Sequence, residues 1–428
     1  MLDRKKAPRI TTDFKLNIEN VDTTRLSNGL SIYEINTSTQ EIIKVELVFK
    51  AGRVNEEKIA AARACLQVIG EGTQTKSSHE VAEVFDFYGA IVKYKCALES
   101  SSISLVCLNR HFDDVWPLFC DILFNPAFDA KETQKYIDVS SQNLRNQISK
   151  NDVISYRILT EKIFGSDHPY GYNTQPEDIS ALMSADLRQF YEKNILLTNA
   201  FVILSGKYSS EIKDKIAVAL DIKTDASVPI KQTFFNNKAP LETFIQKTKN
   251  ESQVSIKMGR QMFSRKHEDY SKMFFLNTLF GGYFGSRLMK NIREEKGYTY
   301  GIYSSLDAYK EDGFFYIGSD VGNDQLDPCI NEINNEMEAL KTKLVGPTEF
   351  EMVRNYILGQ SLHLIDGPFA TGQLIKNIYA KDLDVKAFQD HIQTIKKITP
   401  PDILALANKY FDKNVFTTVL AGSFNNKI

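Results

Sequence analysis

The chain has 428 residues, a length that predicts two or three domains or one large domain. Hydrophobic residues make up 43% of it and charged residues 25%, which excludes a disordered chain, a collagen and a small disulfide scaffold. The 52 basic and 54 acidic residues give a formal net charge of −2, and this balance offers no support for a nucleic-acid partner.

The five cysteines are scattered and form no C-x-x-C pair, which favours reduced thiols. No apolar stretch is long enough for a membrane-spanning helix, so no membrane span is expected. The first residues, Met1 to Pro8, lack the apolar core of a signal peptide. We therefore expect a cytoplasmic protein, with a periplasmic location as the alternative.

In chain order, the pattern predicts a strand over residues 45–52 and helices over 56–69 and 81–88, the second ending at Gly89. Two β-rich runs follow, over 90–98 and 101–108. Residues 223–239 are polar with little periodicity and are interpreted as a linker. Beyond it we expect a strand over 254–259, a helix over 268–280 and a helix that starts at Thr348 with capping-box spacing.

An internal repeat organises these elements. Asp186 to Gly206 and Asp402 to Gly422 each predict a helix capped by Asp and a buried strand that ends in Gly, and the two copies lie 216 residues apart. A half-length offset favours duplication, with halves at 1–222 and 240–428. Helices and hairpins segregated along the chain predict an α+β fold, each half a largely antiparallel sheet packed with helices.

Several segments resemble the pitrilysin/insulinase family of zinc metallopeptidases, in the order that the family has them. These are residues 26–33, 49–53, 71–73, 168–171 and 280–288, and the most specific is Ile292-Arg-Glu-Glu-Lys-Gly-Tyr-Thr-Tyr300. The resemblance covers almost the whole chain and implies a metallopeptidase-like fold of two duplicated halves.

Active members of that family carry His-x-x-Glu-His on the first helix, shortly before a Gly-Thr pair. Two histidines four apart bind zinc and the Glu activates water. Aligned on Gly72-Thr73, the histidine positions hold Arg63 and Gln67, the Glu position holds Leu66, and the third-ligand region falls near Asn143. None of these side chains suits zinc, so no metal and no catalytic residue are expected on this chain alone.

The resemblance implies a different role for Arg293 and Tyr300. In active members an Arg and a Tyr at this spacing face the zinc, the Arg holding a substrate carbonyl and the Tyr hydroxyl stabilising the oxyanion. Both are present here, and we expect them to bind substrate. Their alternative role is structural, as the end of a surface helix and the start of a strand.

Some family members work as two different subunits, of which one carries the zinc motif and the other the Arg/Tyr pair. This chain has the second pattern. The leading hypothesis is a non-catalytic, substrate-binding subunit of a heterodimeric zinc peptidase, with zinc on a homologous partner and unfolded peptides as substrate. The alternatives are a scaffold protein of the same family, an active peptidase with a degenerate metal site, and a peptide-binding homodimer.

Overall fold

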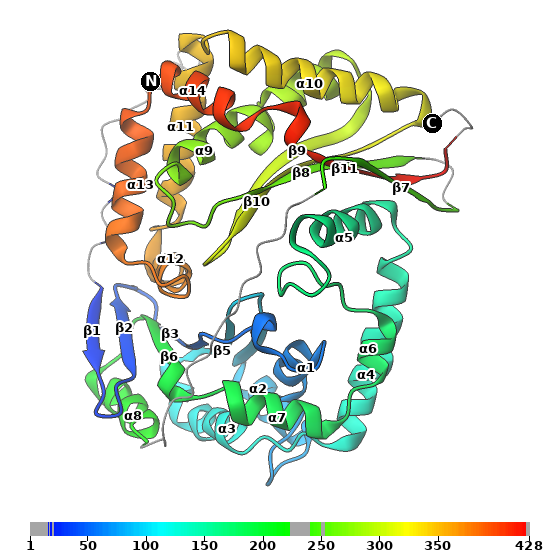
Figure 1. Ribbon diagram of the computed structural model, residues 1–428. Helices are drawn as coiled ribbons and strands as arrows, with labels where there is room; N and C mark the ends of the chain where they lie inside the picture. The colour runs from blue at the N-terminus through cyan, green and yellow to red at the C-terminus, as the bar shows by residue number, and fades with distance from the viewer. Residues whose placement is uncertain (1–15, 17, 19–20, 223–239, 250–252, 425–428) are drawn as a thin grey trace, which may run out of the picture.

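The computed structural model describes residues 16, 18, 21–222, 240–249 and 253–424. The predicted linker, 223–239, lies outside the described residues, and the domain boundaries stay a prediction. Two sheets lie opposite one another with helices between and outside them (Figure 1). No helix of the described ranges is long and apolar enough to cross a membrane.

The first sheet has six strands in the order β1-β2-β6-β3-β5-β4. Only the β2–β6 pair in it is parallel. The strands are β1 (Asp22–Arg25), β2 (Ser31–Asn36), β3 (Ile42–Phe49), β4 (Ile91–Cys96), β5 (Ser101–Leu108) and β6 (Ala200–Gly206). The helices of this half are α1 (Ala61–Val68), α2 (Ser78–Tyr88), α3 (Phe112–Phe124), α4 (Ala130–Gln147), α5 (Asn151–Phe164), α6 (Pro176–Ser180), α7 (Ser184–Asn194) and α8 (Ser210–Leu220), with a short 3-10 turn, η1, at Arg53–Asn55.

The second sheet repeats this plan with five strands in the order β7-β11-β8-β10-β9. Its one parallel pair is β7–β11, which corresponds to β2–β6. The strands are β7 (Thr243–Lys247), β8 (Val254–Met262), β9 (Thr299–Ala308), β10 (Gly313–Val321) and β11 (Thr417–Gly422). The helices are α9 (Tyr270–Asn277), α10 (Leu326–Thr342), α11 (Pro347–His363), α12 (Gly367–Tyr379), α13 (Val385–Lys397) and α14 (Pro400–Tyr410), with π-helical turns η4 (Thr278–Gly282) and η5 (Met289–Glu295). The predicted α+β fold of duplicated, largely antiparallel halves is confirmed.

The repeated Asp residues do not cap their helices in the predicted way. The N-caps are Met183 and Thr399, and Asp186 and Asp402 lie three residues further on. Each carboxylate accepts a hydrogen bond from the N-cap backbone N–H, at 2.8 Å for Asp186 and 2.9 Å for Asp402. The prediction of Asp as N-cap was therefore wrong, but the two copies share the same capping-box geometry.

Three predicted helix boundaries also differ. The first helix starts at Ala61 rather than near residue 56, because Ala60 has a left-handed backbone, with φ of 73°. The helix expected over 268–280 ends as α9 at Asn277 and continues as the π-helical η4. The helix expected from Thr348 begins at Pro347, with Gly346 as its N-cap.

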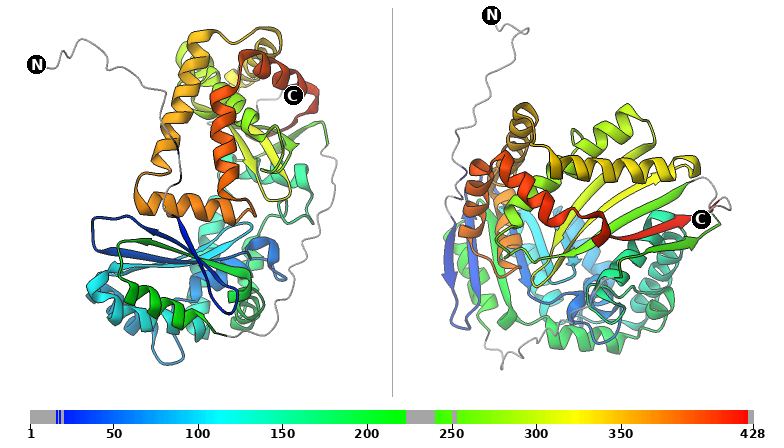
Figure 2. Two further views of the ribbon diagram at one scale, coloured as in Figure 1. Left: turned by 90° about the vertical axis from the view of Figure 1, so that its left-hand side faces the viewer. Right: turned by 45° about the horizontal axis from the view of Figure 1, so that its top comes forward.

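Each half covers the inner face of the other half's sheet with one of its helices. Helix α5 packs on β8 and β11, where Leu159 and Phe164 join Phe314 and Val419 in one apolar cluster. Helix α12 packs on β2 and β6 of the first sheet, as the left view of Figure 2 shows. The two halves are thus joined by a reciprocal exchange of helices.

Candidate functional site

Helix α1 presents two of the four motif residues to the surface and hides a third. Arg63 and Gln67 lie one turn apart on its exposed side. Leu66 is 0% exposed and belongs to the core of the first half. The role of Leu66 is therefore packing. The Gln67 amide donates a hydrogen bond of 3.3 Å to the carbonyl of Tyr94 on the edge strand β4.

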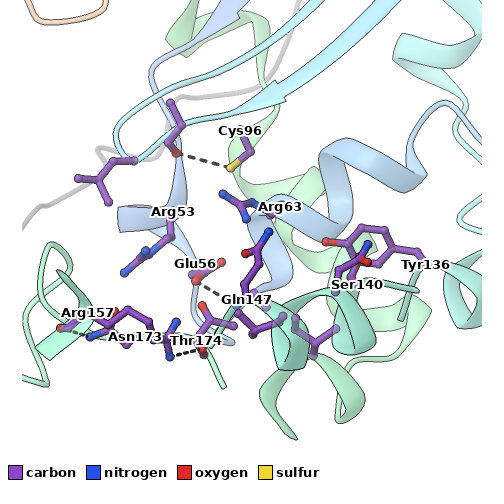
Figure 3. A pocket seen from close by; sticks show the side chains of 16 residues that line it. Arg53, Glu56, Arg63, Cys96, Tyr136, Ser140, Gln147, Arg157, Asn173 and Thr174 are labelled. Carbon is purple, nitrogen blue, oxygen red and sulfur yellow. Dashed lines mark hydrogen bonds between the residues drawn. The ribbon is translucent and has the colours of Figure 1, made fainter. Parts of the chain in front are cut away.

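A cavity of about 540 Å³ is lined by both Arg63 and Asn143. Figure 3 shows this cavity, with Arg63, Glu56 and Arg157 among its labelled side chains. Helices α1, α4 and α5, strand β4 and the segment around residue 174 form its walls. Arg53, Glu56, Arg63, Cys96, Tyr136, Ser140, Asn143, Gln147, Arg157, Asn173 and Thr174 are among the residues that line it. Leu66 and Gln67 are absent from this lining. A neighbouring hollow shares Arg63, Cys96, Tyr136 and Ser140 with the cavity and adds Gln67 and Lys95.

Sequence reasoning missed Glu56, which holds the start of α1. Its carboxylate accepts hydrogen bonds of 3.0 Å from the backbone N–H groups of Ala60 and Ala62, and another from the Tyr172 hydroxyl. Burial raises the pKa of Glu56 despite these hydrogen bonds. An acidic residue just ahead of an apolar helix was the available sequence signal.

Arg53 and Arg157 were also missed, because their neighbours in space come from distant parts of the sequence. Arg53 donates to the carbonyl of Tyr172 and lies 4.1 Å from the centre of that ring. Arg157 on α5 donates to the carbonyl of Thr174 at 2.7 Å. Burial lowers the pKa of Arg157, and the nearby charge of Arg53 lowers it further.

The residues at the motif positions do not fit zinc. Zinc takes thiolate, imidazole or carboxylate ligands, and the cavity offers a guanidinium and an amide at the motif positions that line it. Throughout the part of the chain that the structure describes, no group of three or more His, Cys, Asp or Glu side chains could hold a metal ion. The one carboxylate of the cavity, on Glu56, is already engaged by three donors.

Arg293 and Tyr300 lie outside this cavity, in the second half. Arg293 is half-buried on η5, with its guanidinium 4.9 Å from the ring centre of Phe284. Tyr300 is near the start of the edge strand β9 and is 92% exposed. Among the described residues, neither side chain makes a hydrogen bond or an ion pair. The structure therefore leaves both available at the surface and does not bring them to the motif residues of the same chain.

The chain is similar to several known proteins. Residues 182–357 match a family model described as Peptidase M16 inactive domain. The uncharacterized zinc protease YmxG of Bacillus subtilis is 26% identical over 339 residues, 78% of this chain and 81% of its own length. The protein described as probable inactive metalloprotease YmfF, also of Bacillus subtilis, is 20% identical over 68% of this chain and 70% of its own length.

The chain is thus similar to M16-type proteins, of which the family model and YmfF are described as inactive and YmxG as a zinc protease. A crystal structure of a peptidase M16 inactive domain from Pseudomonas fluorescens superimposes with a TM-score of 0.83, at 19% identity, covering 96% of this chain and 100% of that one. At that identity the likeness establishes the M16 fold alone. The resemblance to zinc metallopeptidases agrees with these matches, which are described as M16 peptidases, zinc proteases or inactive metalloproteases.

Proposed function

We propose that this M16-type chain is the substrate-binding, non-catalytic subunit of a heterodimeric zinc peptidase. It supplies Arg293 and Tyr300 to the active site of a homologous, zinc-bearing partner that degrades unfolded peptides. The observation that carries the proposal is the pairing of a motif unable to hold zinc with a Tyr300 hydroxyl left exposed and unbonded among the described residues. An exposed phenol is a suitable hydrogen-bond donor to an oxyanion that forms in another chain.

The test is cleavage of an unstructured peptide by the pair reconstituted with a His-x-x-Glu-His relative from the same genome. Tyr300→Phe removes one hydroxyl and keeps the ring, and we expect kcat to fall about 10²–10³-fold. Tyr303→Phe is the matched control, because Tyr303 lies on the same strand and is 41% exposed. Equal turnover by both variants would contradict the role of Tyr300.

Arg293→Ala should also weaken peptide binding, because a guanidinium can hold a substrate carbonyl before reaction. Lys290→Ala, on the same η5 turn, removes an equal charge and should leave KM unchanged. The stacking of Arg293 on Phe284 favours a second candidate function, that of a scaffold subunit. If neither Arg293→Ala nor Tyr300→Phe alters cleavage by an assembled pair, the scaffold role replaces our proposal.

A further inference from the structure

The cavity beside α1 concentrates positive charge. Arg53, Arg63 and Arg157 line it from η1, α1 and α5, and the only carboxylate in its lining is that of Glu56. Within the described ranges, none of the three arginines has a carboxylate within 4.0 Å. At longer range Glu56 acts on Arg53, and Glu161 and Asp178 act on Arg157. Arg53 and Arg157 are half-buried, whereas Arg63 is exposed. Partly burying the first two charges without a close counter-ion costs free energy, and a bound anion would offset that cost.

Two of the arginines are held in place but keep free donors. Arg53 and Arg157 each spend one terminal nitrogen on a backbone carbonyl, of Tyr172 and Thr174 respectively. The Arg53 Nε atom is buried and has no hydrogen-bond partner among the described residues. Arg63 has no hydrogen bond of any kind within the same ranges, so its whole guanidinium is available. A guanidinium presents paired N–H groups that match the two oxygens of a carboxylate.

The rest of the lining suits a peptide. Asn143 and Gln147 present amides from one face of α4, and amides can pair with both the N–H and the C=O of a backbone. The volume of about 540 Å³ lies within the roughly 300–1,000 Å³ of small-ligand sites. The hollow that shares Arg63 and Cys96 with the cavity adds Lys95 and continues it along the edge strand β4.

We propose that this cavity, lined by Arg63 and Asn143 of the degenerate zinc motif, binds a carboxylate group of a peptide, with Arg63 as the principal contact. The carboxylate is either the C-terminal one or that of an acidic side chain. The site belongs to this chain alone and needs neither a partner nor Arg293 and Tyr300. Its failure would therefore leave the proposed function standing, and failure of the proposed function would leave the site standing.

The experiment measures binding of short, N-terminally labelled peptides to the isolated full chain by fluorescence anisotropy at low salt. One peptide ends in a free carboxylate and its twin in an amide. We expect the acid to bind about tenfold more tightly, the scale of one charge-assisted hydrogen bond. Equal affinity of these two peptides and of an amidated peptide with one internal glutamate would overturn the proposal.

Matched variants then locate the contact. Arg63→Gln should abolish the advantage of the acid, whereas Arg145→Gln, an exposed arginine of α4 outside the cavity, should retain it. Asn143→Asp adds a carboxylate to the cavity and should weaken the acid peptide but not the amide. Thermal unfolding checks that each variant is folded, and identical losses in Arg63→Gln and Arg145→Gln would contradict a local site.

Two further probes identify the anion. An amidated peptide with one internal glutamate distinguishes the two carboxylate sources, since tight binding assigns the side chain and weak binding assigns the C-terminus. Inorganic phosphate is the competitor. Displacement of the acid peptide by phosphate, at concentrations where acetate has no effect, would overturn the assignment to a carboxylate.

Discussion

Leu66 occupies the position on α1 that the resemblance to zinc metallopeptidases aligns with the carboxylate that activates water. Its side chain is 0% exposed and packs in the first core. Arg63 and Gln67 are exposed on the same helix. The three motif positions therefore differ in whether they tolerate a polar or charged substitution, although they lie within five residues of each other.

Restoring the zinc motif should destabilise the protein only through the substitution of Leu66. Leu66→Glu places a carboxylate in an apolar core, and we expect it to lower the free energy of unfolding by roughly 3–5 kcal/mol. Arg63→His with Gln67→His should change it by less than about 1 kcal/mol, because both side chains are exposed. Urea unfolding of the two variants measures the difference, and equal stability would contradict the packing role of Leu66.

The motif residues also predict the metal content. Elemental analysis should find no stoichiometric zinc in the parent chain, and a peptide assay should find no cleavage by it. In the triple variant Arg63→His, Leu66→Glu and Gln67→His, activity should stay weak, because Asn143 offers no third carboxylate ligand. One tightly held zinc in the parent, with cleavage that a chelator stops, would contradict this expectation.

His391, on α13, is a residue whose titration should affect folding. Its Nδ1 lies 2.9 Å from the Ser271 hydroxyl, and its ring packs against Phe274 at 5.2 Å. Burial, assisted by the charge of Arg265, lowers the pKa of His391 from 6.5 to about 4. The folded chain therefore binds this proton less tightly than the unfolded chain does.

Stability should consequently fall as the pH falls from about 6.5 to about 4, by at most about 3 kcal/mol from this group. His391→Phe should reduce the pH dependence in that window, and His79→Gln should not, since the His79 side chain is 81% exposed. Denaturant unfolding at several pH values provides the measurement. An unchanged pH profile in His391→Phe would show that this histidine does not contribute.

At the scale of elements, α12 is tied to the first sheet by a buried charge. The Lys376 ammonium lies 2.5 Å from a Glu46 carboxylate oxygen on β3 and donates to the Ser102 hydroxyl at 2.8 Å. Lys44 pairs with the other Glu46 oxygen, also at 2.5 Å. Burial alone would raise the pKa of Glu46, but the two ammonium groups outweigh it and hold that pKa below its usual range.

Removing one member of this buried pair should destabilise the protein more than removing both. Lys376→Met leaves Glu46 with only Lys44, and we expect a loss of about 3–5 kcal/mol. Lys376→Met combined with Glu46→Leu should recover most of it, because no buried charge is then left uncompensated. A double-mutant cycle in urea measures the coupling. A double variant as unstable as Lys376→Met alone would contradict this account.

Local sequence patterns predicted most of the elements but few of their contacts. Gly89 ends α2 in the left-handed conformation, with φ of 61°, as expected from its position. The late start of α1 follows the left-handed Ala60, and the Glu56 carboxylate that accepts from the Ala60 N–H meets Tyr172 only in the folded chain. The candidate cavity was predictable at Arg63 and Asn143, from the resemblance alone. Arg157 joins it from α5 through tertiary packing, for which local periodicity carries no signal.

At the scale of the whole molecule, the helix exchange makes the halves depend on each other. In a fragment of residues 1–222, the inner face of the first sheet would lack α12. That face includes Ile35, Val48, Phe201 and Ile203, which form one buried cluster with Ile375. We expect this fragment to aggregate when expressed alone and to become soluble when residues 240–428 are co-expressed. A soluble, monomeric 1–222 fragment would contradict the interdependence of the halves.

The exchange of helices also determines when each sheet face is covered during synthesis of the chain. Strand β6 ends at Gly206, but α12 starts only at Gly367, so the ribosome adds residues 207–366 while that apolar face is uncovered. At about 5–20 residues per second, this delay lasts on the order of ten seconds. Helix α5, in contrast, is synthesised before the strands β8 and β11 on which it docks. The nascent chain thus has a defined period in which a chaperone that binds exposed apolar sheet surface is of use, and that period ends when α12 emerges.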